Sequence, residues 1–376
     1  MIIKSAEIIG LNGLNNHIKL DFNRDLNIIT GRNGSGKTNI LKLIWYVISG
    51  NISYALKEIS FDTVKIETST YTLEVTKKST ISCSFKLNID ERYFSNEDYI
   101  VDDNGYLNTK IIAVVGNKNS NQNFFQTLSE FGNSLFLPTF RRVESSVQVK
   151  KSTIGGLLSS TPLETSLLDI SKTMTKNNHQ FITSLGTYDV ENFLRDKHAE
   201  LTEKSSKIQD VSNNIVSTKL KELQKYTDTE KIQDELQNIH SIMDNSEQLK
   251  QKIMQPLDVA KKYILDILKI SGIEIGNLTF GDTVQTINSN LLSAGEKQML
   301  SFLAYNAFYQ DTIFIIDEPE LSLHVDWQRI LFPTLLKQNS SNQFIVATHS
   351  PFIYAKYPDK ELTWVDDRGD CDGEEQ

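Results

Sequence analysis

Hydrophobic and polar residues alternate in short runs along the first ninety residues, with the period of two that is typical of β-strands. Residues 2–9 and 17–22 predict the two strands of a hairpin, with Asn12 and Gly13 at or near its turn. Further alternating runs between residues 62 and 92 predict an antiparallel meander. We therefore expect an antiparallel β subdomain in the N-terminal part of the chain.

The pattern changes from about residue 150, where glycine becomes sparse. Charged and amide side chains with spaced apolar residues fill 190–254, which predicts helices, with an antiparallel pair as one arrangement. The apolar heptads are too short to predict a long coiled coil. A loosely packed helical insertion without a special role is the plainer interpretation of this region.

Short apolar strands return towards the C-terminus and alternate with helices. The predicted elements are strands at 273–275 and 278–280, a helix at 295–309, a strand at 313–316, a helix at 325–338 and a strand at 344–347. This alternation implies a parallel sheet covered by helices, and thus an α/β fold. We expect three parts: an N-terminal lobe (1–145), a helical insertion (146–268) and a C-terminal lobe with a short acidic tail (269–376).

The composition narrows the classes of function. Of 376 residues, 39% are hydrophobic and 23% charged, and the net charge is −9. A protein that binds nucleic acid over its whole surface would usually be basic. Any nucleic-acid contact of this acidic chain would therefore need a local basic patch or a partner protein. Cys83 and Cys371 are far apart and predict neither a disulfide framework nor a zinc site. Without an apolar leader or a membrane span, a cytoplasmic protein is expected.

A glycine-rich loop lies between an apolar strand at 26–29 and a helical stripe at 38–49. It matches the phosphate-loop pattern G-x-x-x-x-G-K-[ST] through Gly31, Arg32, Asn33, Gly34, Ser35, Gly36, Lys37 and Thr38. The glycines let backbone N–H groups turn towards phosphate oxygens, next to the positive end of the helix. Lys37 is expected to reach the β- and γ-phosphates and Thr38 to bind Mg²⁺, with Asn39 beside them. A turn that binds nothing is the alternative, which this setting disfavours.

Two carboxylates follow the most apolar strand of the C-terminal part. Asp317 and Glu318 come directly after residues 313–316. In a parallel sheet, ligands bind at the carboxyl ends of the strands. Asp317 is therefore placed to hold Mg²⁺, directly or through water, and Glu318 to act as general base on the attacking water. Without a phosphate loop upstream, a strand that runs into a surface turn would be the better interpretation.

A helix start at residue 293 is a second candidate anion site. Ser293 is typical of an N-cap, and Glu296 three residues later completes a capping box. The small residues Ala294 and Gly295 and the serine hydroxyl also suit an anion at the helix N-terminus. Because the chain already has one phosphate loop, this second site suits a γ-phosphate that is brought by another molecule.

His349 follows the apolar strand at 344–347, at the sheet edge where Asp317 and Glu318 are expected. An imidazole there could sense the γ-phosphate through a hydrogen bond. A structural histidine at a strand end is the commoner explanation of an isolated histidine.

In this chain order, the phosphate loop, the segment at 292–298, the carboxylate pair and the His349 segment resemble the ABC-type ATPases of the SMC, RecF and OLD group. In that family they are the Walker A, signature, Walker B and His-switch elements. The segment Glu320–His324 looks like the family's D-loop. The resemblance covers about 1–145 and 270–355.

The resemblance implies a P-loop ATPase head with a mixed or parallel sheet, an antiparallel β subdomain and an inserted α-helical subdomain. It also implies a homodimer that closes head to tail around two ATP molecules with Mg²⁺. The nucleotide would lie between Walker A of one chain and Ser293, Ala294, Gly295 and Glu296 of the other. Glu318 and His349 would be catalytic, and Thr38 and Asp317 would hold the metal. These motifs set no rate, and hydrolysis can be slow.

Two stretches point to a branch of the family. Gly-Glu-Lys-Gln at 295–298 is typical of chromosome-maintenance and defence members rather than transporters. Residues 138–144 are similar to a stretch of OLD-like ATPases from bacterial anti-phage systems. Only about twenty residues follow Ile353, so the Toprim nuclease domain of OLD proteins is not expected.

The chain also departs from the family pattern. No Q-loop glutamine stands where the strand at 134–137 ends; Arg141 or Arg142 lies near that place, and Gln126 is a poor substitute. The helical insertion is much shorter than an SMC arm, so long-range tethering of DNA is not expected.

Three functions remain open. The first is an ATPase that controls a separately encoded effector, a nuclease or toxin, in anti-phage defence. The second is a DNA-repair or chromosome-maintenance ATPase that acts on DNA directly, against which the acidic net charge argues mildly. The third is the ATPase subunit of a transporter. The Gly-Glu-Lys-Gln sequence at 295–298 and the missing Q-loop glutamine disfavour this function.

Overall fold

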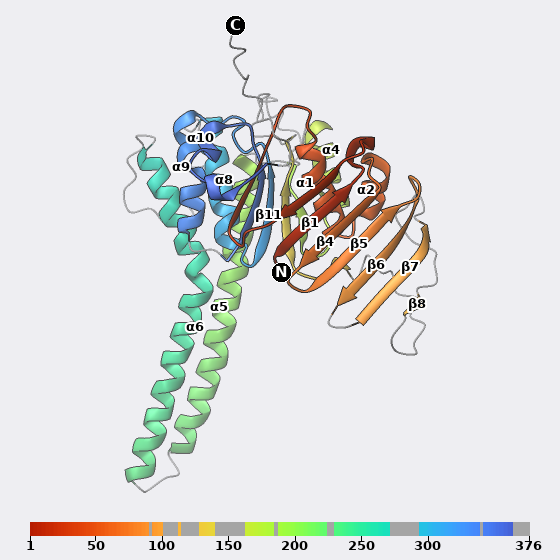
Figure 1. Ribbon diagram of the computed structural model, residues 1–376. Coiled ribbons are helices and arrows are strands. Elements are labelled where there is room, and N and C mark those ends of the chain that lie inside the picture. Colours follow the sequence, from red (N-terminus) through yellow and green to blue (C-terminus); the bar gives the residue numbers. More distant parts are fainter. Residues whose placement is uncertain are drawn as a thin grey trace. The chain divides into compact units, whose positions relative to one another are not determined.

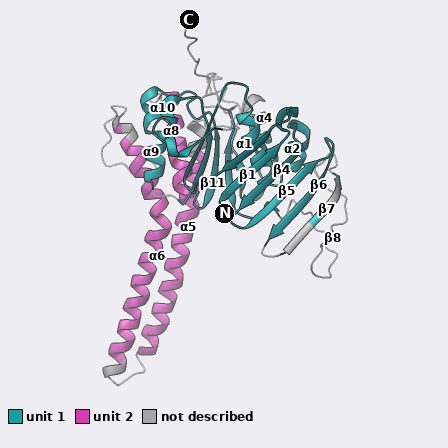
Figure 2. Ribbon diagram, in the orientation of Figure 1, with its two compact units in different colours: residues 1–185, 309–376 teal, residues 186–308 magenta. Residues whose placement is uncertain are grey.

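The computed structural model describes most of the chain as two compact units (Figures 1 and 2). The described residues are 1–89, 92–100, 112–113, 128–139, 162–183, 187–223, 229–270, 293–338 and 341–363. One unit comprises residues 1–185 and 309–376, and the other residues 186–308. The boundary expected after residue 145 lies outside the described residues, and the division into three parts stays a prediction.

An antiparallel sheet forms the N-terminal part of the first unit, in the order β2-β1-β4-β5-β6-β7-β8. Its strands are β1 (Ile3–Ile9), β2 (His17–Asp21), β4 (Thr63–Thr68), β5 (Tyr71–Lys77), β6 (Ser82–Ile89), β7 (Arg92–Ile100) and β8 (Ile112–Ala113). The predicted hairpin and meander are confirmed, and the Leu11–Gly13 turn joins β1 to β2. Strands β7 and β8 lie where the polar sequence carries little alternation, so the pattern did not predict them.

The second sheet is parallel throughout its described pairs, in the order β10-β9-β11-β12-β3-β13. Its strands are β3 (Leu26–Thr30), β9 (Asn133–Leu137), β10 (His179–Phe181), β11 (Thr312–Asp317), β12 (Gln343–Ala347) and β13 (Glu361–Thr363). Strands β3, β11 and β12 are buried along their whole length, as continuous apolar runs in a covered parallel sheet should be. The predicted α/β fold is therefore confirmed, while the strands expected at 273–275 and 278–280 lie outside the described residues.

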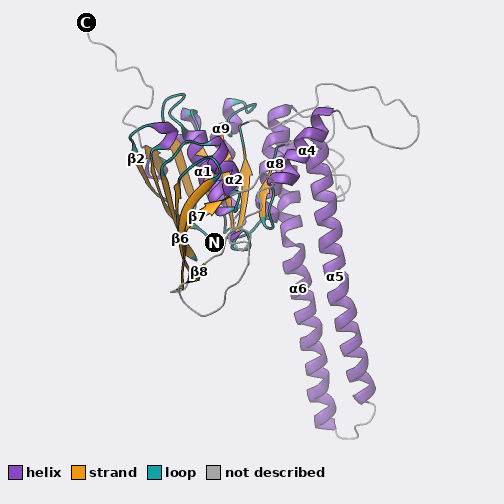
Figure 3. Ribbon diagram, turned by 90° about the vertical axis from the view of Figure 1, so that its right-hand side faces the viewer, coloured by secondary structure: helices purple, strands orange, loops and turns teal. Residues whose placement is uncertain are grey.

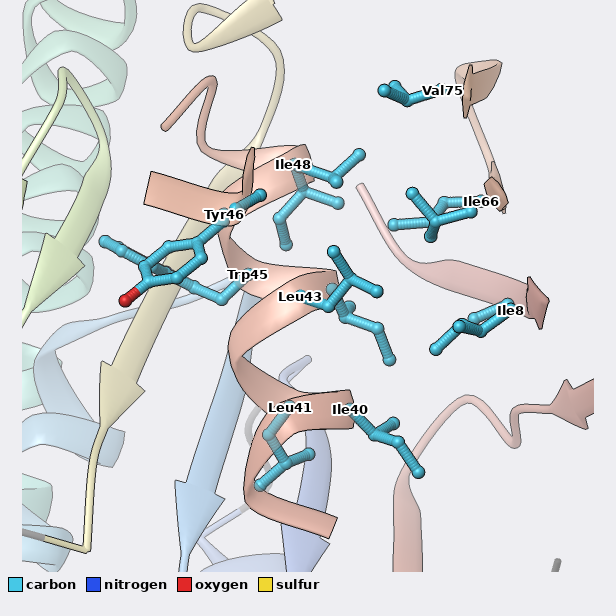
Figure 4. Close-up of a cluster of buried hydrophobic side chains, with 14 of the residues drawn as sticks. Ile8, Ile40, Leu41, Leu43, Trp45, Tyr46, Ile48, Ile66 and Val75 are labelled. Atoms are coloured by element: carbon cyan, nitrogen blue, oxygen red, sulfur yellow. The ribbon is translucent and has the colours of Figure 1, made fainter. Parts of the chain in front are cut away.

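Helix α1 is packed on two sides. The helices of this unit are α1 (Lys37–Ile48), α2 (Ile52–Glu58), α4 (Pro162–Met174), α9 (Val325–Lys337) and α10 (Pro351–Tyr354), with a short 3-10 turn at Pro358–Lys360. Figure 4 shows Ile8, Ile66 and Val75 of the antiparallel sheet on one side of α1, and Trp45 and Tyr46 directed away from them. Trp45 stacks on Phe136 of β9 with ring centroids 5.5 Å apart. Burial on both sides holds the start of α1 in place beside β3.

The second unit consists of three described helices, α5 (Thr187–Leu223), α6 (Thr229–Ile270) and α8 (Ala294–Phe308). α5 and α6 form the antiparallel pair that the pattern predicted (Figure 3). Lys250 Nζ donates to Gln209 Oε1 at 2.6 Å across the pair, and Phe193 of α5 lies 4.6 Å from Tyr305 of α8 between ring centroids. Within the described residues, no helix combines the length and the apolar character needed to cross a membrane.

Candidate nucleotide site

Three strand ends lie side by side at the carboxyl edge of the parallel sheet. In the order β11-β12-β3, Asp317 is in register with Ala347, and Ala347 with Ile29. The phosphate loop follows β3, Glu318 follows β11 and the His349 segment follows β12. Three of the four motifs that lie far apart in the sequence therefore emerge from adjacent strands, as the edge argument predicted.

The loop between β3 and α1 has a backbone that suits a phosphate. Gly34 and Gly36 have φ values of 80° and 95°, in the left-handed region that glycine adopts without strain. A Cβ on Gly36 would lie 2.7 Å from Asn12 Nδ2, so the β1–β2 turn occupies the space of a side chain. Asn39 Nδ2 also donates to Asn12 Oδ1 at 2.7 Å. The turn therefore braces the loop, a role for Asn12 that the hairpin pattern alone did not indicate.

Lys37 folds back over the loop that precedes it. Its Nζ donates to the carbonyl oxygens of Gly31 at 2.8 Å and Arg32 at 2.9 Å, and the residue is only 5% exposed. Nearby, Ser35 Oγ is buried without a hydrogen-bond partner in the described part of the chain. A phosphate in the loop would offer acceptors to both groups, so these residues fit a nucleotide.

Charged groups from all three strand ends act on one another. Burial lowers the pKa of Lys37, and the negative charges of Glu318, Asp317 and Glu320 oppose that shift. Burial also lowers the pKa of His349; the charge of Lys37 adds to this shift, whereas Glu320 and Asp317 oppose it. The lowered pKa favours the neutral imidazole of His349, which can donate one hydrogen bond and accept another. The predicted base, metal ligand and His switch lie within electrostatic reach of the phosphate-loop lysine.

Asp317 is 1% exposed, and its Oδ2 accepts a hydrogen bond from the hydroxyl of Thr139. Thr139 lies just beyond the end of β9, the neighbour of β11, which explains how it reaches the carboxylate. No sequence pattern indicated this role for Thr139, although it follows an apolar strand at the same sheet edge. The Q-loop candidates Arg141, Arg142 and Gln126 lie outside the described residues.

Thr38 and Asp317 supply oxygen atoms of the kind that Mg²⁺ prefers. Among the described residues, no group of three or more His, Cys, Asp or Glu side chains forms a metal site. A nucleotide-bound Mg²⁺ needs only one or two protein ligands, because phosphate and water oxygens complete its shell. The pair therefore fits Mg²⁺ that arrives with ATP, where the ion would neutralise charge on the phosphates.

Glu318 has a strained backbone, with φ at 47°. Its N–H donates to the carbonyl oxygen of Ala347 at 2.8 Å, which ties the residue to the end of β12. A non-glycine residue in this region costs about 1–3 kcal/mol, and such strain is concentrated at functional sites. This strained residue is the half-buried Glu318, which the sequence assigned as the general base.

The loop after β11 is bonded to the loop after β12. Glu320 Oε1 accepts from Thr348 Oγ1 and from the backbone N–H of His349, both at 2.7 Å. Its Oε2 is buried and has no hydrogen-bond partner among the described residues. The sequence placed Glu320 in a D-loop by resemblance, but no pattern indicated that it contacts the His349 segment.

The signature segment lies in the helical unit and begins α8. Ser293 N and Oγ donate to Glu296 Oε2 at 2.7 and 2.8 Å, and Glu296 N donates to Ser293 Oγ at 3.3 Å. The predicted capping box is confirmed. Ser293 is exposed, whereas Gly295 is buried, and the role of Ser293, Ala294, Gly295 and Glu296 towards a nucleotide stays a prediction.

Curated proteins with known names match short stretches of the chain. The Septu protein PtuA of Bacillus thuringiensis is 43% identical over 63 residues, and the match covers 16% of each protein. The endonuclease GajA of Bacillus cereus (strain VD045) is 35% identical over 77 residues, 19% of this chain and 13% of GajA. The Retron Ec83 probable ATPase of Escherichia coli is 37% identical over 75 residues, 16% of this chain and 14% of that protein. The chain thus matches only a small part of each relative's length.

Two solved structures align over most of the chain. The Smc head domain of Pyrococcus furiosus has 15% identity and a TM-score of 0.38, covering 94% of this chain and 91% of that one. The recombination mediator protein RecF has 11% identity and a TM-score of 0.35, covering 93% of each chain. The family assignment rests instead on a family model, described as "AAA domain, putative AbiEii toxin, Type IV TA system", that matches residues 26–355. The chain belongs to this AAA-domain family.

Proposed function

We propose that this chain hydrolyses ATP with Mg²⁺ and works as a homodimer that closes around two ATP molecules. The observation that carries the proposal is the register of Asp317, Ala347 and Ile29, which brings the phosphate loop, two carboxylates and His349 to one edge. The phosphate loop, the carboxylate pair and His349 lie far apart in the sequence. Their meeting in space is what phosphoryl transfer needs, because it depends mainly on positioning and electrostatics.

Each residue of the edge has a distinct task. Residues 31–39 bind the triphosphate, and Lys37 leaves its carbonyl partners for the β- and γ-phosphates. Thr38 and Asp317 hold the metal. Glu318 takes a proton from the attacking water, and His349 forms a hydrogen bond with the γ-phosphate.

Exposed apolar side chains around the edge support a dimer. Leu321 is 41% exposed and lies three residues after Glu318; Phe352 is 36% exposed and lies three residues after His349. Leu14, in the turn that braces the phosphate loop, is 59% exposed. A second copy that closes over this edge would cover these three side chains. The partner would add Ser293, Ala294, Gly295 and Glu296 to each ATP.

A complementation experiment tests the shared sites. Lys37→Ala disables the phosphate loop and Ser293→Arg the signature, so each variant alone should be inactive. In a mixture, half of the dimers are mixed and each has one intact site, so turnover should recover to about a quarter of the wild-type value. If the mixture stays inactive although each variant still binds wild-type chain, the ATP sites are not shared between two chains.

Glu318→Gln should keep ATP affinity and stop hydrolysis, because the amide cannot accept the proton. The expected product is an ATP-bound dimer, visible by light scattering on a sizing column. The matched control is Glu58→Gln, whose carboxylate accepts from Tyr46 away from the strand ends. A monomer that persists with ATP and Mg²⁺ would refute nucleotide-driven dimerisation.

We further propose that the ATPase controls a separately encoded effector, a nuclease or toxin, in anti-phage defence. The short matches to PtuA, GajA and the retron ATPase support this, as does the toxin named in the family description. Purification of Glu318→Gln chain from cells that carry its native locus should retain the effector at a fixed ratio. If no neighbouring gene product copurifies and the chain binds DNA with a steep salt dependence, direct action on DNA is the better reading.

A further inference from the structure

We propose that Glu320 and Thr348 form a clamp that positions His349 at the γ-phosphate. The inference rests on the proposed function, because it assigns a task within ATP hydrolysis. It concerns positioning residues, since neither side chain needs to touch the nucleotide.

The clamp consists of hydrogen bonds to one carboxylate oxygen. Glu320 Oε1 accepts from Thr348 Oγ1 and from His349 N, both at 2.7 Å. Ser350 N in turn donates to Thr348 Oγ1 at 3.0 Å. The backbone on both sides of His349 is therefore held through a single carboxylate, with charge-assisted bonds that are stronger than neutral ones.

The same contacts continue into the first turn of α9. Ser350 Oγ donates to Gln328 Oε1 at 2.6 Å, and Gln328 Nε2 donates to the carbonyl oxygen of Leu323 at 2.8 Å. Leu323 N donates to the carbonyl oxygen of Glu320 at 2.9 Å. The bonds thus close a ring that joins the loop after β11 to the loop after β12.

The loop after β11 contains strained backbone that the ring of hydrogen bonds can hold in place. Glu318 and Ser322, on either side of Glu320, have φ values of 47° and 70°. Left-handed non-glycine residues persist only where the surrounding contacts hold them. The ring supplies such contacts, so the backbone around Glu320 and that of the His349 segment are held together. A displacement of the exposed Leu321 side of this loop would therefore move His349 as well.

The nucleotide-free protein provides the first test, by hydrogen–deuterium exchange of the peptide around residues 347–352. Glu320→Ala removes the acceptor of the His349 N–H, and Thr348→Val removes the acceptor of the Ser350 N–H. In each variant, the amide that loses its acceptor should exchange about tenfold faster than in wild type. Thr348→Ser keeps the hydroxyl and should keep the protection. Glu361→Gln is the matched control, because Glu361 also accepts from a threonine hydroxyl, that of Thr30 at 2.6 Å, outside the ring.

A double-mutant cycle provides the second test. Glu320→Ala and Thr348→Val should each lower kcat by about 10-fold or more while the Kd for ATP changes less than about threefold. Thr348→Ser should stay within about twofold of wild type. In a His349→Ala background, Glu320→Ala should cause no further loss of kcat, because the clamp acts through His349.

The outcomes separate this inference from the proposed function. Losses of kcat that multiply in the Glu320→Ala/His349→Ala double variant would overturn the clamp while leaving the ATPase intact. Unchanged exchange in both Glu320→Ala and Thr348→Val would overturn it as well. If instead the wild-type chain binds and hydrolyses no ATP, the proposed function fails, whereas the exchange result still reports on the clamp.

Discussion

The two helix N-termini assigned to phosphate, those of α1 and α8, are built in opposite ways. α1 begins after Gly36, which has no side chain to cap the first turn, and no side-chain hydrogen bond caps it. α8 begins after Ser293, which forms reciprocal hydrogen bonds with Glu296. The first terminus leaves its N–H groups to a ligand, whereas in the second the N–H groups of Ser293 and Glu296 are satisfied by side chains of the same helix end.

This difference shows how one chain can hold one strong and one conditional anion site. A capping box contributes about 1 kcal/mol, so α8 keeps its first turn without any ligand. A phosphate at Ser293 would have to compete with the Glu296 carboxylate for the serine hydroxyl. The α1 loop has no such competitor, because Lys37 bonds only to carbonyl oxygens of the loop in the described contacts. We therefore expect ATP to bind first at α1 and to engage α8 afterwards.

The largest effect should come from Lys37→Ala, which removes the cation at the uncapped N-terminus of α1. The Kd for ATP should rise by at least about 100-fold, equivalent to about 2.7 kcal/mol, measured by calorimetric titration. Lys42→Ala is the control, one turn further along α1, where the side chain lies 3.6 Å from Glu58. Equal affinity in wild type and Lys37→Ala would place the nucleotide elsewhere.

Ser293→Arg should affect turnover rather than binding, because it blocks only the capped terminus. The Kd for ATP should stay within about threefold, while kcat falls by about 50-fold or more. Ser241→Arg places the same side chain on an exposed position of α6 and should be neutral. Normal hydrolysis by Ser293→Arg would show that the start of α8 takes no part in the ATP site.

Gly36→Ala tests whether the open terminus depends on a bare backbone. With φ at 95° and a Cβ 2.7 Å from Asn12 Nδ2, the substitution should lower the free energy of unfolding by about 1–2 kcal/mol. Gly34→Ala is the informative partner, because a Cβ there meets no atom within 4 Å and only the backbone is strained. Chemical denaturation should rank Gly36→Ala below Gly34→Ala, and the reverse order would mean that Asn12 does not brace the loop.

The smallest effect is expected for Glu296→Ala, which opens half of the α8 cap. Stability should fall by about 0.5–1 kcal/mol, seen as a small decrease in Tm. Glu247→Ala, on the exposed surface of α6, serves as the control. A Tm above that of wild type would show that the capping box is strained rather than stabilising.

The sheet edge was predictable because each motif follows an apolar strand, and parallel strands bring their carboxyl ends together. The capping box was predictable because Ser293 and Glu296 are local to one helix turn. The contacts of Thr139 with Asp317 and of Thr348 with Glu320 were not, because they depend on which strands are neighbours. Strand order is set by three-dimensional packing, and periodicity in the sequence does not report it.

The strand order has a consequence for how the protein comes to be folded. Strand β3, which carries the phosphate loop, pairs with β12 and β13, and both are synthesised after residue 342. During translation, β3 therefore leaves the ribosome long before either of its sheet neighbours exists. Because such distant pairings form late, a growing chain cannot complete a nucleotide pocket until its last strands have emerged.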